Sequence, residues 1–323
     1  MGCLDTYRRL RANGVMGLNW RNAEYILEYN ERRFYPLVDD KLLSKELAEK
    51  AGIAVPKLFG VIRYPHEVRT FCDIVQGHED FVVKPAEGSG GDGILVVMGR
   101  HGDGFRLANG VVMSPAEIRF HINNILAGTF SLGGQLDKAL IEYRIKFDKV
   151  FEKIAFRGVP DIRIIVFLGV PVMAMTRLPT EESKGKANLH QGAIGAGIDM
   201  TTGKTLNAVW HDKIITKHPN TGAPVRGVQI PHWDTLLSHA ARSHQLTGLG
   251  YQGIDMVLDE DRGPVMLELN ARPGLSIQIA NGEGLGLRVA AVEAELARDP
   301  SAFDDLAARI AFAKSNCAPR PVA

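Results

Sequence analysis

The sequence has few cysteines, no long apolar run and no block of charge of one sign. Its three cysteines, at positions 3, 72 and 317, stand far apart, which argues against a disulfide framework and a structural zinc site. No apolar run approaches the roughly 20 residues that a membrane helix needs, so we expect no membrane span. The formal net charge of +1 argues against a general nucleic-acid-binding protein. Together these absences favour a reducing, cytoplasmic location.

The sequence also lacks the zinc-binding motif of metalloproteases and the motifs of nucleophilic catalysis. No His-Glu-x-x-His motif occurs, and no serine or cysteine stands with a histidine in a convincing catalytic arrangement. What the chain does contain is a hydrophobic fraction of 45% over 323 residues, which is enough to bury a large core. This composition predicts an ordinary globular chain of two or three lobes.

The most informative stretch covers residues 253–274. Alternating apolar residues predict strands at 253–258 and 265–270, joined by a turn rich in Asp, Gly and Pro. Paired as an antiparallel hairpin, the strands would place Val265 opposite Leu258 and Glu268 opposite Asp255. Cross-strand partners have Cβ atoms about 5 Å apart. Two carboxylates that close repel each other unless a cation lies between them.

Asn270 would add a third oxygen-bearing side chain on the face of Glu268. Carboxylate and amide oxygens suit a hard cation such as Mg²⁺, which completes its coordination shell with water and phosphate oxygens. Arg272 follows two residues later, before Pro273 and Gly274, so a guanidinium group would stand beside the ion. The pattern predicts a metal–phosphate site, and a solvated acidic hairpin face is the alternative.

A second candidate site is a glycine-rich loop between two strands. The strand at 81–85 is apolar except for Lys84, and another apolar strand follows at 94–98. The loop between them matches Gly-x-Gly-x-x-Gly, but a strand follows it where a dinucleotide-binding motif requires a helix. A flap of this kind can lay backbone N–H groups over a polyphosphate while a strand lysine reaches the phosphates.

Single cations in apolar strands give a further signal. Arg163 and Arg177 each stand in a strongly β-forming run. An arginine in such a place faces a phosphate or a carboxylate, and an ion pair within the chain is the alternative. In the small, glycine-rich loop at 183–197, Asn188 and His190 are the polar groups that could touch a substrate.

Capping residues predict where several helices begin. Asp39 would cap a helix over 40–51, and Ser301 would cap a helix over 302–314. A capping box of Ser114 and Glu117, with proline at the first helical position, would begin a third helix that ends at Gly128. The first 38 residues have weak helical periodicity and predict a helical arm.

In order and spacing, these parts resemble the ATP-grasp superfamily of carboxylate–amine ligases over roughly residues 37–295. Within it the chain is similar to the α-L-glutamate-ligase-like branch, which is related to the enzyme that adds glutamates to a ribosomal protein. The Asn-Ala-Arg-Pro-Gly-Leu ending is also similar to the sugar-transfer-associated ATP-grasp group. The residues that carry the resemblance are Lys41, Lys84, Glu142, Asp161, Arg163, Arg177, Asp255, Glu268, Asn270 and Arg272.

The resemblance implies an α/β (α+β) ATP-grasp fold, with two lobes that clasp a nucleotide between them. We expect a helical arm at 1–38, an N-lobe with the glycine flap at 39–140, a C-lobe with the metal site at 141–316 and a tail at 317–323. The arm stands in place of the full N-terminal α/β domain that family members usually carry.

The resemblance also implies roles for the site residues. Lys41 and Lys84 would bind the α- and β-phosphates of ATP beneath the flap, and the segment at 142–145 would hold adenine. The flap residues are Gly88, Ser89, Gly90, Gly91 and Gly93, and the adenine and loop residues are Glu142, Tyr143, Ile145 and Asn188. Asp255, Glu268 and Asn270 would hold one or two Mg²⁺ ions, with Mn²⁺ as the alternative metal. Arg163, Arg177 and Arg272 would neutralise the γ-phosphate and the substrate carboxylate. Either Asp148 or Glu152 would bind the ribose.

The implied activity is ATP-dependent ligation of a carboxylate to an amine through an acyl phosphate. Glutamate or another amino acid would be joined to a peptide or a small amine. An ATP-grasp phosphotransferase that acts on a hydroxyl and an inactive nucleotide-binding protein are the alternatives. Because only the short arm precedes the core, a second subunit or a partner protein would complete the acceptor site.

Overall fold

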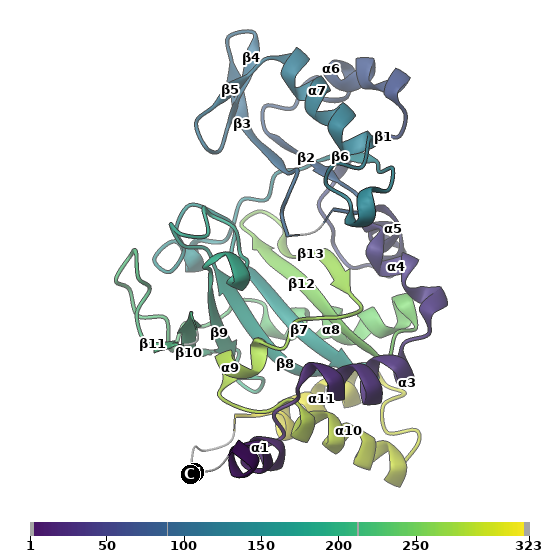
Figure 1. Cartoon of the computed structure of the whole chain (residues 1–323), viewed down its shortest axis with the longest axis vertical. Helices are drawn as coiled ribbons and strands as arrows, with labels where there is room; N and C mark the ends of the chain where they lie inside the picture. The colour runs from purple at the N-terminus through teal and green to yellow at the C-terminus, as the bar shows by residue number, and fades with distance from the viewer. Residues whose placement is uncertain (1–2, 89, 212, 320–323) are drawn as a thin grey trace. The chain divides into compact units, whose positions relative to one another are not determined.

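The computed structural model of the chain describes residues 3–88, 90–211 and 213–319, so Ser89 of the predicted flap lies outside the described residues. The chain divides into two compact units (Figure 1). The larger unit comprises Met1–Asp39, Glu46–Ala54 and Lys146–Ala323, and the smaller unit comprises Asp40–Lys45 and Val55–Ile145. Among the helices described, none is both long enough and apolar enough to cross a lipid bilayer.

The smaller unit is built on a six-stranded antiparallel sheet with the strand order β1-β6-β2-β3-β4-β5. Its strands are β1 (Leu58–Ile62), β2 (Phe81–Pro85), β3 (Leu95–His101), β4 (Gly104–Leu107), β5 (Val112–Met113) and β6 (Ala139–Glu142). Its helical segments are η3 (Pro65–Thr70), α6 (Phe71–Ile74), α7 (Pro115–Leu126) and η4 (Leu132–Gly134), and α5 (Lys41–Lys50) begins in it. β6 is the last strand of this unit in the sequence, and it lies between β1 and β2, which brings Glu142 beside the strand that carries Lys84.

Helix α7 shows how sequence pattern and core agree in the smaller unit. The predicted capping box is confirmed, because the Ser114 hydroxyl accepts from the Glu117 N–H and the Glu117 carboxylate accepts from the Ser114 N–H. The buried residues Ile118, Ile122 and Ile125 follow at spacings of four and three, which places them on one helix face.

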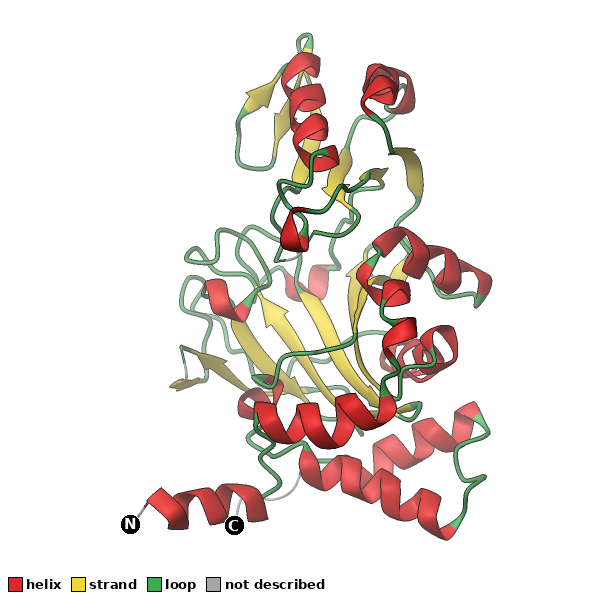
Figure 2. Cartoon of the chain, turned by 45° about the vertical axis from the view of Figure 1, so that its right-hand side comes forward, coloured by secondary structure: helices red, strands yellow, loops and turns green. Residues whose placement is uncertain are grey.

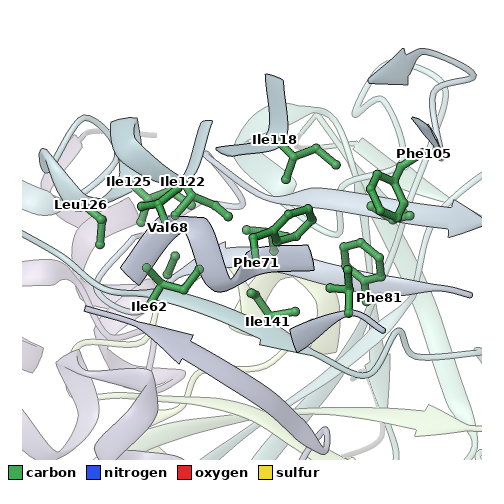
Figure 3. Close-up of a cluster of buried hydrophobic side chains, with 14 of the residues drawn as sticks. Ile62, Val68, Phe71, Phe81, Phe105, Ile118, Ile122, Ile125, Leu126 and Ile141 are labelled. Atoms are coloured by element: carbon green, nitrogen blue, oxygen red, sulfur yellow. The ribbon is translucent and has the colours of Figure 1, made fainter. Parts of the chain in front are cut away.

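Three phenylalanines lie in the hydrophobic core that α7 helps to form (Figure 3). Phe71, Phe81 and Phe105 meet edge to face with ring centroids 5.4–5.9 Å apart, an arrangement that aromatic pairs prefer. The core therefore joins α6 and α7 to one face of the sheet that contains β2 and β6, the strands of Lys84 and Glu142.

The larger unit is built on a seven-stranded antiparallel sheet with the order β11-β10-β9-β8-β7-β12-β13. Its strands are β7 (Asp161–Phe167), β8 (Val170–Leu178), β9 (Ile194–Ile198), β10 (Thr205–Trp210), β11 (Lys213–Ile215), β12 (Tyr251–Asp259) and β13 (Gly263–Asn270). The central strands β7, β8, β9 and β12 are buried along nearly their whole length, which fits a sheet covered on both faces.

Helices border this sheet, as the red and yellow ribbons of Figure 2 show. Helices α8 (Trp233–Thr247), α10 (Gly286–Arg298) and α11 (Leu306–Asn316) contact its central strands, and α9 (Ile277–Asn281) contacts β8, β9 and β10. The first residues form α1 (Cys3–Ala12), α2 (Leu18–Trp20), a π-helical segment η1 (Arg21–Ile26), α3 (Leu27–Tyr29), η2 (Arg32–Phe34) and α4 (Pro36–Asp39). Two further short turns are η5 (Lys149–Phe151) and η6 (Leu189–Gln191).

The hairpin β12–β13 confirms one half of the predicted register and corrects the other. Asp255 pairs with Glu268 as predicted, but Val265 pairs with Val257 and not with Leu258. The register shifts between Asp255 and Met256, because a β-bulge adds one residue to β13 at this point. The predicted alternation of inward and outward side chains is therefore broken next to Asp255 and Glu268. Bulges are frequent beside functional sites.

Two of the predicted helix caps are also wrong by a few residues. Asp39 is the last residue of α4, so it has helical backbone geometry, and Asp40 instead accepts the Leu42 N–H at 2.8 Å to begin α5. At the other end of the chain, α11 begins after Asp305, whose carboxylate accepts from the Ala308 N–H, and not after Ser301. In both places several adjacent residues can cap a helix, and only the path of the chain selects one.

The phenylalanine core predicts a large effect of a single truncation. Phe71→Ala is expected to lower the free energy of unfolding by about 3–5 kcal/mol, because it removes a fully buried ring and leaves a cavity. Phe120→Ala in the same unit is the control, since that ring is 68% exposed, and its effect should stay within about 0.5 kcal/mol. Chemical denaturation of both variants measures the difference, and equal effects would contradict the assigned core.

Candidate functional site

Five charged side chains from four neighbouring strands share one face of the larger sheet. Asp161 pairs with Arg177 across β7 and β8, Arg163 pairs with Asp255 across β7 and β12, and Asp255 pairs with Glu268 across β12 and β13. Opposed residues of antiparallel strands point to the same side, and Asp161 and Arg163 are two residues apart on one strand. The local β pattern of each strand therefore assembles the cluster.

Asp255 is the centre of this cluster. Its Oδ1 accepts from Arg163 Nε at 2.7 Å, and its Oδ2 accepts from Arg163 Nη2 at 2.6 Å and from Arg177 Nη2 at 2.7 Å. Burial would raise the pKa of Asp255, but the guanidinium groups of Arg163 and then Arg177 outweigh it and hold the pKa well below its usual range. The carboxylate is therefore ionised and shared by two arginines.

Asp161 holds the second arginine from its other side. Arg177 donates to both Asp161 carboxylate oxygens, one of them through Nε at 2.6 Å. Burial raises the pKa of Asp161 to about 6, against the lowering effect of Arg177. Both arginines thus form ion pairs with carboxylates of the chain itself. A role of Arg163 and Arg177 in neutralising a phosphate stays a prediction.

The three side chains predicted to hold a metal do lie near one another, with Asn270 turned to Asp255 through its amide nitrogen. Asn270 Nδ2 lies 3.4 Å from Asp255 Oδ2, and a side-chain hydrogen bond between Glu268 and Asp255 contributes to the low pKa of Asp255. Two carboxylates and an amide oxygen fit a hard cation by their chemistry. Within the described residues, no group of three or more His, Cys, Asp or Glu side chains is arranged to hold a metal ion. Asn270 and a rearranged Asp255 would have to complete such a site, and the metal assignment stays a prediction.

The smaller unit holds a separate buried charge cluster around Glu142, the last residue of β6. Lys84 Nζ lies 2.5 Å from Glu142 Oε1, and Lys45 Nζ lies 2.7 Å from Glu142 Oε2. Relative exposures of 3% for Lys45, 6% for Lys84 and 3% for Glu142 place all three out of water. Lys45 also donates to the Pro56 carbonyl at 3.0 Å. One carboxylate therefore orients two ammonium groups.

The expected adenine-binding segment is engaged in part by these contacts. Burial would raise the pKa of Glu142, but Lys84 and Lys45 hold this pKa below its usual range. The Glu142 side chain is therefore an anion that is ion-paired with both lysines. The Tyr143 N–H donates to the Lys57 carbonyl at 2.8 Å, and Ile145 is buried. A role of these residues in binding adenine stays a prediction.

The glycine loop begins next to Lys41, at the start of α5. The Lys41 backbone N–H donates to the Ala86 carbonyl at 3.1 Å, and Lys41 Nζ donates to the Gly88 carbonyl at 2.5 Å. At Gly93 the φ angle is +75°, and a Cβ atom there would lie 2.6 Å from the Phe130 ring, so only glycine fits. Gly90 and Gly91 also have positive φ angles. The loop has the backbone that a flap needs, and phosphate binding by it stays a prediction.

Two of the predicted site residues lie apart from these clusters. The Arg272 guanidinium lies 5.2 Å from the centroid of the Tyr35 ring, and within the described part of the chain it makes no ion pair. Asn188 caps the short turn η6, where its Oδ1 accepts from the His190 N–H at 3.0 Å. Ligand contacts for both residues stay predictions.

A comparison with protein families identifies the family of the chain. Residues 20–294 match the model of the sugar-transfer-associated ATP-grasp family. The chain belongs to that family. The predicted α+β ATP-grasp fold and the resemblance to the superfamily are thereby confirmed. The family match extends into the N-terminal arm, beyond the start of the resemblance stated from the sequence at about residue 37.

Individual relatives of this ATP-grasp protein are distant. A probable α-L-glutamate ligase of Aliivibrio salmonicida is 25% identical over 256 residues, which is 79% of this chain and 63% of the relative. Another, of Thioalkalivibrio sulfidiphilus, is 26% identical over 251 residues, which is 77% of this chain and 61% of the relative. The chain thus spans less than two thirds of the length of these relatives. A D-alanine–D-alanine ligase structure from Bacillus anthracis aligns with a TM-score of 0.44 and 15% identity, over 88% of this chain and 69% of that chain.

Sequence reasoning missed Lys45 in this ATP-grasp chain, and it named Asp161 only as part of the resemblance, without a role in the site. Lys45 follows Lys41 by four residues on α5, a spacing that puts both on one helix face, and this spacing is the signal that could have identified it. Asp161 precedes Arg163 by two residues, and the same alternation that placed Arg163 on the polar face also places Asp161 there. Their partners, Glu142 and Arg177, were named without these contacts.

The shared carboxylate predicts the effect of removing one arginine. Arg177→Met is expected to lower the free energy of unfolding by about 3–5 kcal/mol, because it leaves Asp161 and part of Asp255 buried without a counter-charge. Arg226→Met is the control, since Arg226 is exposed and its Nη1 lies 3.4 Å from the Asn207 Oδ1. Denaturant titration compares the two. A loss below about 1 kcal/mol for Arg177→Met would show that the carboxylates do not depend on it.

Proposed function

We propose that this chain is an ATP-dependent carboxylate–amine ligase. Its carboxylate substrate would be glutamate or another amino acid, and its acceptor a peptide or a small amine. Membership of the ATP-grasp family and similarity to relatives described as probable α-L-glutamate ligases support the proposal. We further propose a cytoplasmic location, and a second subunit or partner protein that completes the acceptor site.

The observation that carries the proposal is the cluster on β7, β8, β12 and β13. It combines four oxygen-bearing side chains, Asp161, Asp255, Glu268 and Asn270, with two guanidinium groups, and these described residues include no serine, cysteine or histidine that could act as a nucleophile. Phosphoryl transfer depends on positioning and charge neutralisation far more than on a covalent nucleophile. A cluster of this composition supports chemistry on a phosphate rather than covalent catalysis.

The proposed reaction has two steps. An oxygen of the substrate carboxylate attacks the γ-phosphorus of ATP, and ADP leaves with the electron pair of the broken P–O bond. The amine then attacks the acyl carbon of the acyl phosphate, inorganic phosphate leaves, and the nitrogen loses a proton. Lys41 and Lys84 would bind the α- and β-phosphates, with Lys84 oriented by Glu142 at 2.5 Å. The flap glycines would cover them with backbone N–H groups.

Asp255, Glu268 and Asn270 would hold Mg²⁺, with Mn²⁺ as the alternative. When bound, the ion would offset the negative charge on the phosphate oxygens. Arg163 and Arg177 keep Asp255 ionised in the structure, and in the ligase they would add positive charge beside the transferred phosphoryl group. Arg272 would complete this set at the substrate carboxylate.

The decisive test is trapping of the acyl phosphate. Release of ADP from Mg-ATP is measured with glutamate and with other amino acids, with and without hydroxylamine. ADP release that depends on the carboxylate, together with a hydroxamate of matching mass, is the expected result. Transfer of phosphate to a hydroxyl without a hydroxamate would identify a phosphotransferase instead. Nucleotide binding without any turnover would favour an inactive binding protein or a missing acceptor partner.

Two substitutions separate the proposed metal and phosphate roles. Glu268→Ala is expected to lower turnover more than about 100-fold by removing a metal ligand. Lys84→Ala is expected to weaken ATP binding by about 10–100-fold, since a hydrogen bond to a charged group contributes about 1.5–3 kcal/mol. Glu260→Ala and Lys149→Ala are the matched controls, because these two residues form an exposed ion pair with each other. Wild-type turnover in Glu268→Ala would refute the metal assignment.

A further inference from the structure

The segment that leaves β13 is held by residues from the N-terminal arm (residues 3–38). This segment, called here the exit loop, comprises residues 270–274 and begins with Asn270 of the charged cluster. Arg21 Nη1 donates to the Pro273 carbonyl at 2.8 Å, and Asn30 Nδ2 donates to the Ala271 carbonyl at 3.2 Å. Two carbonyls of the loop are therefore bonded by side chains that lie about 240 to 250 positions earlier in the chain.

Asn30 is hydrogen-bonded both to the start of β12 and to the residue that follows β13. Besides its bond to Ala271, its Nδ2 donates to the Tyr251 carbonyl at 2.6 Å, and its Oδ1 accepts from the Tyr251 N–H at 2.8 Å. Tyr251 begins β12 and Ala271 follows the last residue of β13. Asn30 is only 4% exposed, so these bonds are shielded from competition by water.

Arg21 is fixed by a second set of bonds. Its Nε and Nη2 donate to Asn22 Oδ1 at 3.1 and 2.8 Å, and the residue is 7% exposed. The planar guanidinium group is thus oriented before it reaches Pro273. On its other side Pro273 packs against β12, where a Cβ atom added to Gly253 would lie 2.8 Å from the Pro273 Cβ. The exit loop is seated between β12 and Arg21.

A second pair of contacts extends the attachment beyond the exit loop. Gln278 of α9 accepts the Met16 N–H at 2.8 Å and donates to the Met16 carbonyl at 2.9 Å. Arg272 itself lies over the ring of Tyr35, another arm residue. Four arm residues therefore contact the stretch from 271 to 278, while the same arm leaves side chains such as Leu27 exposed to solvent.

We propose that Arg21 and Asn30 are positioning residues that fix the exit loop and thereby set the placement of Asn270 and Arg272. A strand end leaves carbonyl groups without ladder partners, and in this chain the arm supplies the donors. The consequence for catalysis rests on the proposed function, because Asn270 and Arg272 are assigned there to the metal and the substrate carboxylate. The mechanical part of the proposal does not depend on that assignment.

Hydrogen exchange of the full-length protein tests the mechanical part directly. In Arg21→Met, amide exchange in peptides covering residues 271–278 should rise at least tenfold, while exchange across β7 stays as in the wild type. Arg21→Lys keeps one cation that can reach Pro273, so it should recover part of the protection. Leu27→Ala is the control in the same arm, since this side chain is 69% exposed, and it should change neither region.

Two exchange results would overturn the proposal. One is unchanged protection of residues 271–278 in both Arg21→Met and Asn30→Ala. The other is an equal rise in exchange across β7 and the exit loop in Arg21→Lys as well as Arg21→Met, because this would show a general loss of stability and no specific positioning.

Steady-state kinetics tests the consequence for catalysis. Arg21→Met should lower kcat about tenfold and alter the KM for ATP less than threefold, and Arg21→Lys should restore part of kcat. Unchanged kcat in Arg21→Met with a loosened exit loop would overturn the catalytic consequence. An absence of turnover in the wild type with the expected exchange pattern would refute the proposed function and leave the positioning role intact.

Discussion

The buried carboxylate of Asp255 is the constraint on which the larger unit's polar cluster depends. A charge this deeply buried is tolerated only with counter-charges and satisfied oxygens, and Arg163 and Arg177 provide both at 2.6–2.7 Å. The need to neutralise Asp255 fixes the two arginines, and Asp161 fixes Arg177 in turn. Four neighbouring antiparallel strands must keep their register for these groups to meet.

The smaller unit also contains a buried cluster of charged side chains, but there the positive charges are in excess. There Glu142 is the single anion between Lys45 and Lys84. In both units a residue expected from the sequence to bind a ligand is held by a charged group of the chain itself. Such groups are preorganised, because their side chains lose little freedom when a phosphate or a substrate arrives. The proposed chemistry therefore acts through side chains whose positions are fixed by ion pairs before any ligand binds.

Local sequence pattern was sufficient for much of the fold. Alternation predicted the β12–β13 hairpin and the pairing of Asp255 with Glu268, and the Ser114–Glu117 capping box predicted the start of α7. The errors have local physical causes as well. A one-residue bulge shifted the pairing of Val265, and α4 took up Asp39 so that Asp40 became the cap of α5. Bulges and caps depend on small differences in backbone path that neighbouring residues do not encode alone.

The sequence by itself determined which residues share a strand face and which family the order of motifs resembles, because both depend on spacing along the chain. Only the tertiary structure decided what these residues touch. Arg163 faces Asp255 across 92 positions, and Arg21 reaches Pro273 across 252. Pairings at such separations are selected by the packing of whole strands and helices, since no local pattern records which distant partner offsets a buried charge or donates to a carbonyl at a strand end.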